Sequence, residues 1–247
     1  MIHTKLQKPK INISTDKNYK TVKKMVQESY LNTVCAEARC PNIYECWNRK
    51  TATLMILGDT CTRACGFCSV KTGKPTWNDP LEPIRVAQAV KKMGLRHVVI
   101  TSVDRDDLKG DFGASIWADT INQTKKVNPG CTVEVLTPDF KGFEPALKIV
   151  FDSKPDIFSH NVECVERISK AVRAQANWQR SLGVLEKSIQ HGLRTKTGIM
   201  VGLGEEVEEV KKTMRQVVDL GVQIFTIGQY LQPTKNHLKV EEYISKE

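Results

Sequence analysis

Two short stretches of the sequence each hold three cysteines. They are Cys35, Cys40 and Cys46 in CAEARCPNIYECW, here the first triad, and Cys61, Cys65 and Cys68 in GDTCTRACGFCSV, here the second triad. The chain has 8 cysteines and no visible secretion signal, and thiols stay reduced in the cytosol. Cysteines grouped in this way indicate metal ligands or catalytic groups rather than disulfides.

The spacing within the triads separates the possible metals. The first triad reads C-x4-C-x5-C and the second C-x3-C-x2-C, and no histidine lies between Cys35 and Cys68. Structural zinc usually takes four ligands from repeated C-x2-C pairs, which neither triad offers. Iron–sulfur clusters are held by thiolates, and a cubane bound by three cysteines leaves one iron open to an outside ligand. The spacing favours such clusters, with zinc and purely structural cysteines as the alternatives.

Length and composition are those of a globular protein. The chain has 247 residues, of which 40% are hydrophobic and 26% charged, and a β/α barrel of about 250 residues is commonly a single domain. No apolar run approaches the roughly 18 residues that a membrane span requires. We expect a cytoplasmic protein that does not associate with membranes.

The net charge of +9 indicates an acidic partner or simply a solvated basic surface. The lysines are scattered or paired, no basic block occurs, and aromatic residues make up only 6%. These features argue against nucleic acid as the partner.

Beyond residue 50 the sequence alternates between short β-branched runs and segments with helical periodicity. The six predicted strands span residues 51–57, 97–103, 132–137, 156–161, 195–203 and 223–231. One intervening helix is indicated by Ile84, Ala87, Val90 and Met93. Strands separated by crossover helices pair in parallel, and six units are two short of a closed eightfold barrel.

The predicted fold class is therefore α/β, a partial (β/α)6 TIM-type barrel. Residues 1–50 form an N-terminal extension that carries the first triad, and residues 51–247 form the barrel, the two making a single compact domain. Active sites of β/α folds lie at the carboxyl ends of the strands. The second triad begins directly after the first predicted strand, where a site is expected.

The motifs together carry a family resemblance. C-x3-C-x2-C after the first strand of such a barrel, with Phe67 before the last cysteine, resembles the radical S-adenosylmethionine enzymes. Together with CAEARCPNIYECW, GLRHVVITSVDRDDL, EVLTPDF, MVGLGE and TIGQYLQP, it resembles the lipoyl synthase family from about residue 20 to 240.

The resemblance implies two 4Fe-4S clusters with different tasks. The cluster on the second triad would bind S-adenosylmethionine at its open iron, and one electron would release a 5′-deoxyadenosyl radical, a step that the cofactor must carry because no side-chain base removes hydrogen from an alkane. The first triad would hold an auxiliary cluster that is consumed to supply sulfur at C6 and C8 of an octanoyl chain.

The resemblance also implies the partners. The octanoyl chain would be attached to a lysine of a lipoyl carrier domain, such as that of a dehydrogenase E2 subunit or the glycine cleavage H protein. The electron would come from a reduced ferredoxin or flavodoxin type of donor.

Seven further residues are predicted to contact the cofactor. They are Phe67, Thr101, Glu134, Asn161, Arg173, Gly202 and Leu203. By resemblance, Asn161 would hold the ribose or amino acid end of S-adenosylmethionine and Arg173 would approach its carboxylate. The glycine turn of MVGLGE would pack against adenine, and Glu134 would point into the barrel by strand alternation.

Other chemically capable residues have simpler interpretations. Asp104, Asp106 and Asp107 follow the second predicted strand, where carboxylates commonly cap the next helix, although contact with substrate or cofactor is the alternative. Cys131 and Cys164 stand alone and are expected to be buried. His160 is expected to be structural.

The sequence departs from the family at one point. Members usually continue past QYLQP and close with an Arg-Ser-Ser-Tyr motif whose serine is the fourth ligand of the auxiliary cluster, whereas this sequence ends at KVEEYISKE. Radical generation is expected to tolerate that difference better than sulfur insertion. A biotin-synthase-like sulfur inserter and a non-enzymatic iron–sulfur or nucleic-acid-binding protein are the alternative functions.

Overall fold

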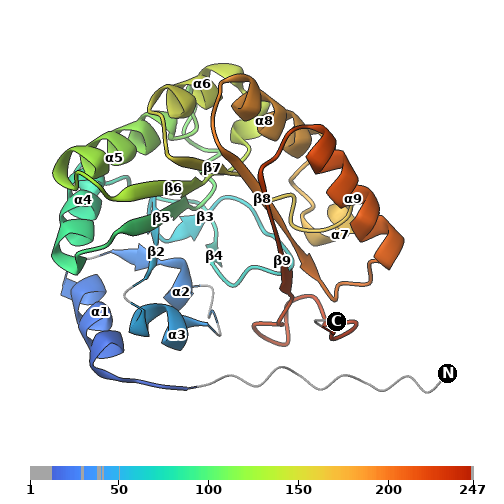
Figure 1. The fold of residues 1–247 in the computed structure, drawn as a ribbon, viewed down its shortest axis with the longest axis horizontal. Helices are drawn as coiled ribbons and strands as arrows, with labels where there is room; N and C mark the ends of the chain where they lie inside the picture. Colours follow the sequence, from blue (N-terminus) through green and yellow to red (C-terminus); the bar gives the residue numbers. More distant parts are fainter. Residues whose placement is uncertain (1–12, 29–30, 38–39, 41, 50, 246–247) are drawn as a thin grey trace.

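A twisted, mostly parallel sheet forms the centre of the molecule (Figure 1). The computed structural model describes residues 13–28, 31–37, 40, 42–49 and 51–245. The strand order is β1-β2-β5-β6-β7-β8-β9, with parallel pairing throughout except for the antiparallel pair of β1 and β2. The strands are β1 (Asn32–Thr33), β2 (Thr53–Ile56), β5 (His97–Ser102), β6 (Thr132–Leu136), β7 (Ile157–Ser159), β8 (Thr195–Val201) and β9 (Ile224–Gln229). The six predicted strands and their parallel order are confirmed.

Helices cover the convex side of this sheet (Figure 1). The five crossover helices are α4 (Glu82–Met93), α5 (Ala114–Val127), α6 (Glu144–Asp152), α8 (Trp178–Gln190) and α9 (Val207–Asp219), with η1 (Phe140–Gly142) before α6 and α7 (Glu166–Val172) before α8. The sixth predicted strand, β9, is followed by irregular chain from residue 230 to 245, so the described residues supply no helix after it. Nor does any helix in the described ranges have both the length and the apolar character to cross a membrane.

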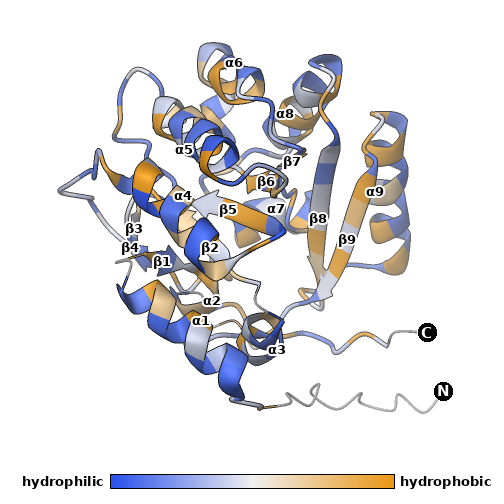
Figure 2. Ribbon diagram, turned by 60° about the vertical axis from the view of Figure 1, so that its left-hand side comes forward, coloured by the Kyte–Doolittle hydropathy of each residue, from blue (hydrophilic) through white to orange (hydrophobic). Residues whose placement is uncertain are grey.

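The helices are amphipathic, as their sequences predict, with one detail corrected. Figure 2 shows hydrophilic and hydrophobic residues in bands along the outer helices, the pattern of helices with one buried side. In α4 the buried face holds Ala87, Val90 and Met93, together with Val86. Ile84 lies on the opposite side and is 49% exposed, because the Pro83 turn starts the buried stripe one position earlier than the spacing suggested.

The two faces of the sheet differ in packing. In β5, Val98 and Ile100 are fully buried, while His97 and Val99 are partly exposed. In β8, the Thr195 hydroxyl lies 2.7 Å from the Ser188 hydroxyl of α8. Thr195 and every second residue after it in β8 therefore face the helices. The opposite set therefore lines a concave face that is open rather than filled by side chains.

The N-terminal segment joins the same core as the barrel. Its helices are α1 (Lys17–Glu28), α2 (Val34–Glu37) and α3 (Ile43–Asn48), and β1 extends the sheet beside β2. The Tyr19 ring stacks on Tyr44 at 5.4 Å between centroids and contacts Trp47 at 5.2 Å. These aromatic contacts fix α3, and the cysteine it carries, against α1.

The contact between β7 and α6 gives a test of the helix–sheet layer. Phe158 is 0% exposed and meets Phe151 edge to face at 5.0 Å. We expect Phe158→Ala to lower the free energy of unfolding by about 3–5 kcal/mol, since it leaves a cavity in a packed core, as measured by denaturant unfolding. Phe143→Ala is the matched control, because Phe143 is 41% exposed, and a similar loss there would contradict the assignment.

Candidate active site

A closed loop after β2 carries the second triad. A sharp turn at Leu57 and Gly58, both with positive φ (67° and 93°), ends the strand. Two short parallel strands, β3 (Thr60–Cys61) and β4 (Lys71–Thr72), then bring the ends of the loop together. Within the loop, the amide of Cys68 donates to the carbonyl of Cys65 at 3.1 Å. This cysteine loop, defined as residues 61–73, holds its three thiols at the carboxyl end of the sheet, where the sequence predicts them.

The three thiols share an environment that disfavours the free thiolate. Burial, with a further contribution from the Asp104 carboxylate, raises the pKa of Cys61 to about 11 and that of Cys65 to about 12. Burial likewise raises the pKa of Cys68. Thiolates are the metal-binding form, so metal binding at this loop must displace protons.

A cavity of about 270 Å³ opens between the cysteine loop and the strand ends. Seven predicted site residues line it, namely Cys61, Cys65, Phe67, Cys68, Thr101, Asn161 and Arg173. Several residues that the sequence interpretation did not propose as site residues line it too, among them Arg63, Asp139 and Glu163. The fold thus brings most of the predicted second-triad site together from the ends of β2, β5 and β7 and from the end of α7.

Arg63, between the first two cysteines of the loop, is the centre of a buried ion network. Its guanidinium is 6% exposed and pairs with Asp106 through Nε at 2.9 Å, with Asp139 through Nη2 at 2.7 Å and with Asp104 through Nη1 at 3.3 Å. Arg180 adds a second cation on Asp139 at 3.1 Å. The network ties the loop to the ends of both β5 and β6.

The same network shifts the pKa values of Asp139 and Asp104 in opposite directions. Burial opposes ionisation of Asp139, but the hydrogen bond and charge of Arg63 outweigh it and hold the pKa of Asp139 well below its ordinary value. For Asp104 burial dominates and raises the pKa to about 6, although Arg63 opposes the shift. Asp104 also contacts the Cys61 sulfur at 3.9 Å. Sequence reasoning missed Arg63 and Asp139, although each lies directly after a strand end.

The expectation that the aspartates after β5 cap the next helix is wrong. Asp106 pairs with Arg63, and Asp107 pairs with Arg105 at 2.9 Å. The carboxylate at the start of α5 is that of Asp111, which accepts the amides of Gly113 and Ser115 at 2.9 Å each. Two arginines close by in the fold attract these carboxylates more strongly than a helix end does.

Arg173 occupies the far wall of the cavity and has unused donor capacity. Its guanidinium donates to the carbonyls of Asn161 at 3.2 Å and Val162 at 3.1 Å. Its Nε is buried and has no hydrogen-bond partner among the described residues. A buried unpaired donor of this kind is costly unless a ligand accepts from it.

His160 is structural, as expected. Its Nδ1 lies 2.9 Å from the Thr137 carbonyl and its Nε2 lies 3.0 Å from the Ser181 hydroxyl. The carbonyl can only accept, so Nδ1 carries the proton. Burial, together with the charge of Arg173, lowers the pKa of His160 to about 4. Cys131 and Cys164 are both buried, as predicted.

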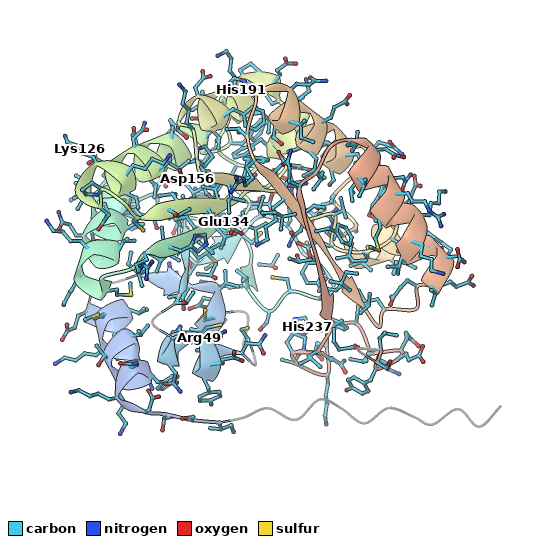
Figure 3. The ribbon with its side chains drawn as sticks, in the orientation of Figure 1. Arg49, Lys126, Glu134, Asp156, His191 and His237 are labelled. Carbon is cyan, nitrogen blue, oxygen red and sulfur yellow. The ribbon has the colours of Figure 1, made fainter. Side chains whose placement is uncertain are left out.

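Three predicted cofactor contacts do not line the cavity. Glu134 lies deeper on the concave face (Figure 3), with Lys196 Nζ at 2.7 Å and His97 Nε2 at 3.4 Å. The amides of Gly202 and Leu203 donate to the Glu205 carboxylate at 2.5 Å and 2.9 Å. Their roles stay predictions without support from this cavity.

The first triad lies in the N-terminal layer. Cys35 in α2 is buried, while Cys40 and Cys46 are partly exposed. Burial raises the pKa of Cys46, and the nearby thiols of Cys35 and Cys40 raise it further. Val34, next to Cys35, lines the same cavity as the second triad. The fold therefore gathers the first triad and sets it beside the cavity.

The Arg63 network predicts a large cost for losing its cation. We expect Arg63→Gln to lower the free energy of unfolding of the iron-free protein by about 3 kcal/mol, because it leaves buried carboxylates unpaired. Arg63→Lys should recover only part, since an ammonium cannot form the fork. Denaturant unfolding measures both. The control is Arg49→Gln, which removes an ion pair whose arginine is 74% exposed and should cost less than about 1 kcal/mol.

Within the described residues, no three His, Cys, Asp or Glu side chains are placed to hold a metal ion in the structure as it stands. A cubane cluster does not require such a point, because each thiolate binds a different iron.

Comparison with solved structures supports the barrel assignment. The chain superimposes on Streptococcus suis SuiB with a TM-score of 0.60 at 12% identity, over 94% of this chain and 50% of that one. It superimposes on methylornithine synthase (PylB) with a TM-score of 0.59 at 12% identity, over 93% and 63% of the two chains. At such identities the likeness shows the fold alone, which is the predicted partial barrel.

Comparison of sequences shows the family. The Radical SAM superfamily model matches residues 55–217. Lipoyl synthase of Rubrobacter xylanophilus is 56% identical over 95% of this chain and 73% of its own length, and that of Oceanobacillus iheyensis is 53% identical over 97% and 78%. The mitochondrial lipoyl synthase of Nematostella vectensis is 50% identical over 97% and 84%. The superfamily implies a 4Fe-4S cluster and S-adenosylmethionine as cofactors. With its cysteine loop and cavity at the carboxyl end of a partial barrel, the chain belongs to the lipoyl synthase family of radical S-adenosylmethionine enzymes.

Proposed function

We propose that the second triad holds the 4Fe-4S cluster and that S-adenosylmethionine binds in the cavity beside it. The supporting observation is that three thiols and a buried arginine with an unpaired N–H line one cavity. Three thiolates leave one iron of a cubane open. The donor set therefore fits the group that the family uses.

Different residues of the cavity would contact different parts of S-adenosylmethionine. Arg173 would donate its free Nε–H to the carboxylate of the cofactor, which would satisfy an otherwise orphaned donor. Asn161 would hold the ribose or amino acid end. Phe67 supplies an apolar ring beside the cysteines, and Thr101 fixes the floor because its hydroxyl donates to the Leu136 carbonyl at 2.8 Å.

The bound cluster and S-adenosylmethionine would supply a carbon radical able to take hydrogen from an unactivated methylene. The chain's own part is to orient the reactants and to exclude water from the reacting carbon. Val70, Val103 and Leu136 line the cavity with apolar surface for that purpose. The buried Arg63 network holds the loop, and therefore its thiols, in a fixed position relative to these walls.

We infer that the first triad holds the auxiliary cluster that supplies two sulfur atoms. The closeness of Val34 to the cavity supports this, because sulfur must reach the same chain carbon from which hydrogen is taken. The substrate would be an octanoyl chain on a lipoyl carrier domain, of a dehydrogenase E2 subunit or the H protein, and the electron donor a ferredoxin or flavodoxin. The compartment we propose is the cytoplasm.

The division of labour between the triads is testable by separate substitutions. We expect Cys65→Ala to abolish 5′-deoxyadenosine formation, since it removes a ligand of the radical-forming cluster. Cys40→Ala should leave 5′-deoxyadenosine formation within about twofold but eliminate the two-sulfur product. Both are read by mass spectrometry after anaerobic reconstitution, with about eight irons per chain expected for two cubanes in the unsubstituted protein.

Cys131→Ala is the matched control, because Cys131 belongs to neither triad, and it should change neither readout. If Cys40→Ala made the two-sulfur product at full yield, the first triad would not be the sulfur source. If the unsubstituted chain bound about four irons and gained no sulfur, only the radical half of the proposal would stand.

The proposed carboxylate contact of Arg173 predicts a binding defect. Arg173→Lys keeps the charge but loses the planar fork, so we expect the Kd for S-adenosylmethionine to rise about tenfold, as one charged hydrogen bond is worth roughly that factor. Calorimetric titration of the reconstituted protein measures it. Arg194→Lys, at an exposed position, is the control, and equal affinities in all three proteins would remove Arg173 from the cofactor site.

A further inference from the structure

The chain after β9 forms irregular loops at the end of that strand (Figure 1) and contacts the cysteine loop, which is also called the cluster-binding loop. This segment, residues 230–244, has no helix or strand and is called the strap here. Its backbone groups find partners at three places in the barrel rather than within a regular element. An irregular segment that is anchored in this way is held in place by specific contacts with the barrel.

The strap meets the cluster-binding loop through two adjacent residues. The amide of Leu238 donates to the Gly66 carbonyl at 2.9 Å. The Nε2 of His237 lies 3.0 Å from the Cys68 carbonyl. Both accepting carbonyls belong to the C-G-F-C half of the second triad, so these bonds hold the part of the loop that carries two of its three thiols.

The proton positions on His237 follow from its partners. A carbonyl oxygen only accepts, so Nε2 must donate to Cys68. The Nδ1 lies 2.7 Å from the Thr234 hydroxyl, which can donate to it, and the amide group of Gln232 donates to the His237 carbonyl at 2.8 Å. The imidazole is therefore fixed in orientation by the strap itself before it meets the loop. Figure 3 shows His237 below the end of β9, separate from Glu134 on the sheet.

Gly66 is shaped to receive the strap. A Cβ at this glycine would lie 2.9 Å from Leu238 Cγ and 3.0 Å from its Cδ1. Real side chains essentially never approach so closely, so the absence of a side chain at position 66 is what lets Leu238 sit on the loop. This steric fit is independent of the hydrogen bonds and points to the same docking contact.

The strap is also anchored to the barrel away from the loop. The amide of the buried Tyr230, the first residue of the strap, donates to the Val201 carbonyl of β8 at 2.8 Å, and its hydroxyl donates to the Leu238 carbonyl within the strap at 2.7 Å. Gln229 accepts the Ile244 amide at 2.8 Å, and the Glu241 amide donates to the Gly202 carbonyl at 2.9 Å. The strap thus spans from the cluster-binding loop to the glycine turn after β8, and it fixes their separation.

We propose that the strap is a clamp on the cluster-binding loop and that His237 is its positioning residue, holding Cys65 and Cys68 through the Cys68 carbonyl. The clamp itself is a property of the iron-free chain. Its consequence for cluster retention rests on the proposed function of the second triad. A loop without the clamp would open more often and would release iron faster.

The first test uses iron-free protein and amide hydrogen exchange of residues 61–73. His237→Phe keeps a ring but loses the donor, and His237→Gln keeps a donor. We expect the Gly66 and Cys68 amides to exchange roughly two- to tenfold faster in His237→Phe, the range for one net hydrogen bond, with partial recovery in His237→Gln. The Thr62 amide, bonded to the Asp104 carbonyl at 3.0 Å, should not change. Unchanged exchange throughout the loop would overturn the clamp.

The second test measures iron release to a chelator and the electron paramagnetic resonance signal of the reduced cluster with S-adenosylmethionine. Release should be several-fold faster in His237→Phe than in the matched His191→Phe, since His191 pairs with Asp152 on the outer helices. If the unsubstituted chain held no iron at the second triad, the proposed function would fail while the exchange result still decided the clamp. Equal release rates with a normal cluster would contradict its role in cluster retention.

A double-mutant cycle separates the steric contact from any general loss of stability. Gly66→Ala alone should speed loop exchange, because the methyl displaces Leu238. In a Leu238→Ala background the same change should cost several-fold less, since the clashing side chain is gone. Purely additive effects would show that Leu238 does not dock on Gly66.

Discussion

The buried guanidinium of Arg63 is the interaction on which the site depends. It stands inside the cysteine loop, yet its partners, Asp104, Asp106 and Asp139, come from the ends of β5 and β6. The loop has few apolar side chains with which to dock, chiefly Phe67 and Val70, so charge pairing in a sheltered position contributes strongly to its location. An arginine can meet three carboxylates at once because its donors lie in a fixed planar fork. Moving the loop away from the strands would leave several charges buried without partners, which is far more costly than any single contact it makes.

The open barrel explains why such pairing is needed. In a closed barrel, inward side chains fill the centre and support the loops above them. Here the helix-facing positions, such as Val98 and Ile100, are fully buried, while the concave positions, such as Val99, stay partly exposed. The concave face therefore offers room for a substrate but little support for the site. Support comes instead from the rim, through the Arg63 network on one side of the cysteine loop and the strap on the other.

The sequence was informative where its signal was local. Six strands could be predicted from β-branched runs bounded by turns, and the second triad from its spacing and its place after the first strand. Contacts set by the tertiary fold could not be read in this way. The aspartates after β5 resembled helix caps, because a carboxylate before a helix is a common cap. Instead, Asp106 pairs with Arg63, which is distant in sequence, and Asp107 pairs with Arg105, two residues before it. Glu134 was correctly given to the concave face by alternation, but alternation does not give depth, and its partners are Lys196 and His97. The roles of His237 and Gly66 depend on a chain reversal that no local pattern encodes.

The high pKa values of the second-triad thiols show why a fixed loop matters for the proposed binding of iron. Buried thiols beside a carboxylate are protonated in the free protein, as the pKa of about 12 for Cys65 indicates, so the iron binding proposed here would displace protons and also cost loop entropy. If the loop were also mobile, that entropy would be paid at each binding event. Because the Arg63 network and the strap fix the loop in the free chain, the thiols are already arranged and only the proton cost remains. This preorganisation has a second effect, because the proposed site must exclude water. The cysteine loop is itself one wall of the cavity, so that wall does not have to close when the cofactor binds.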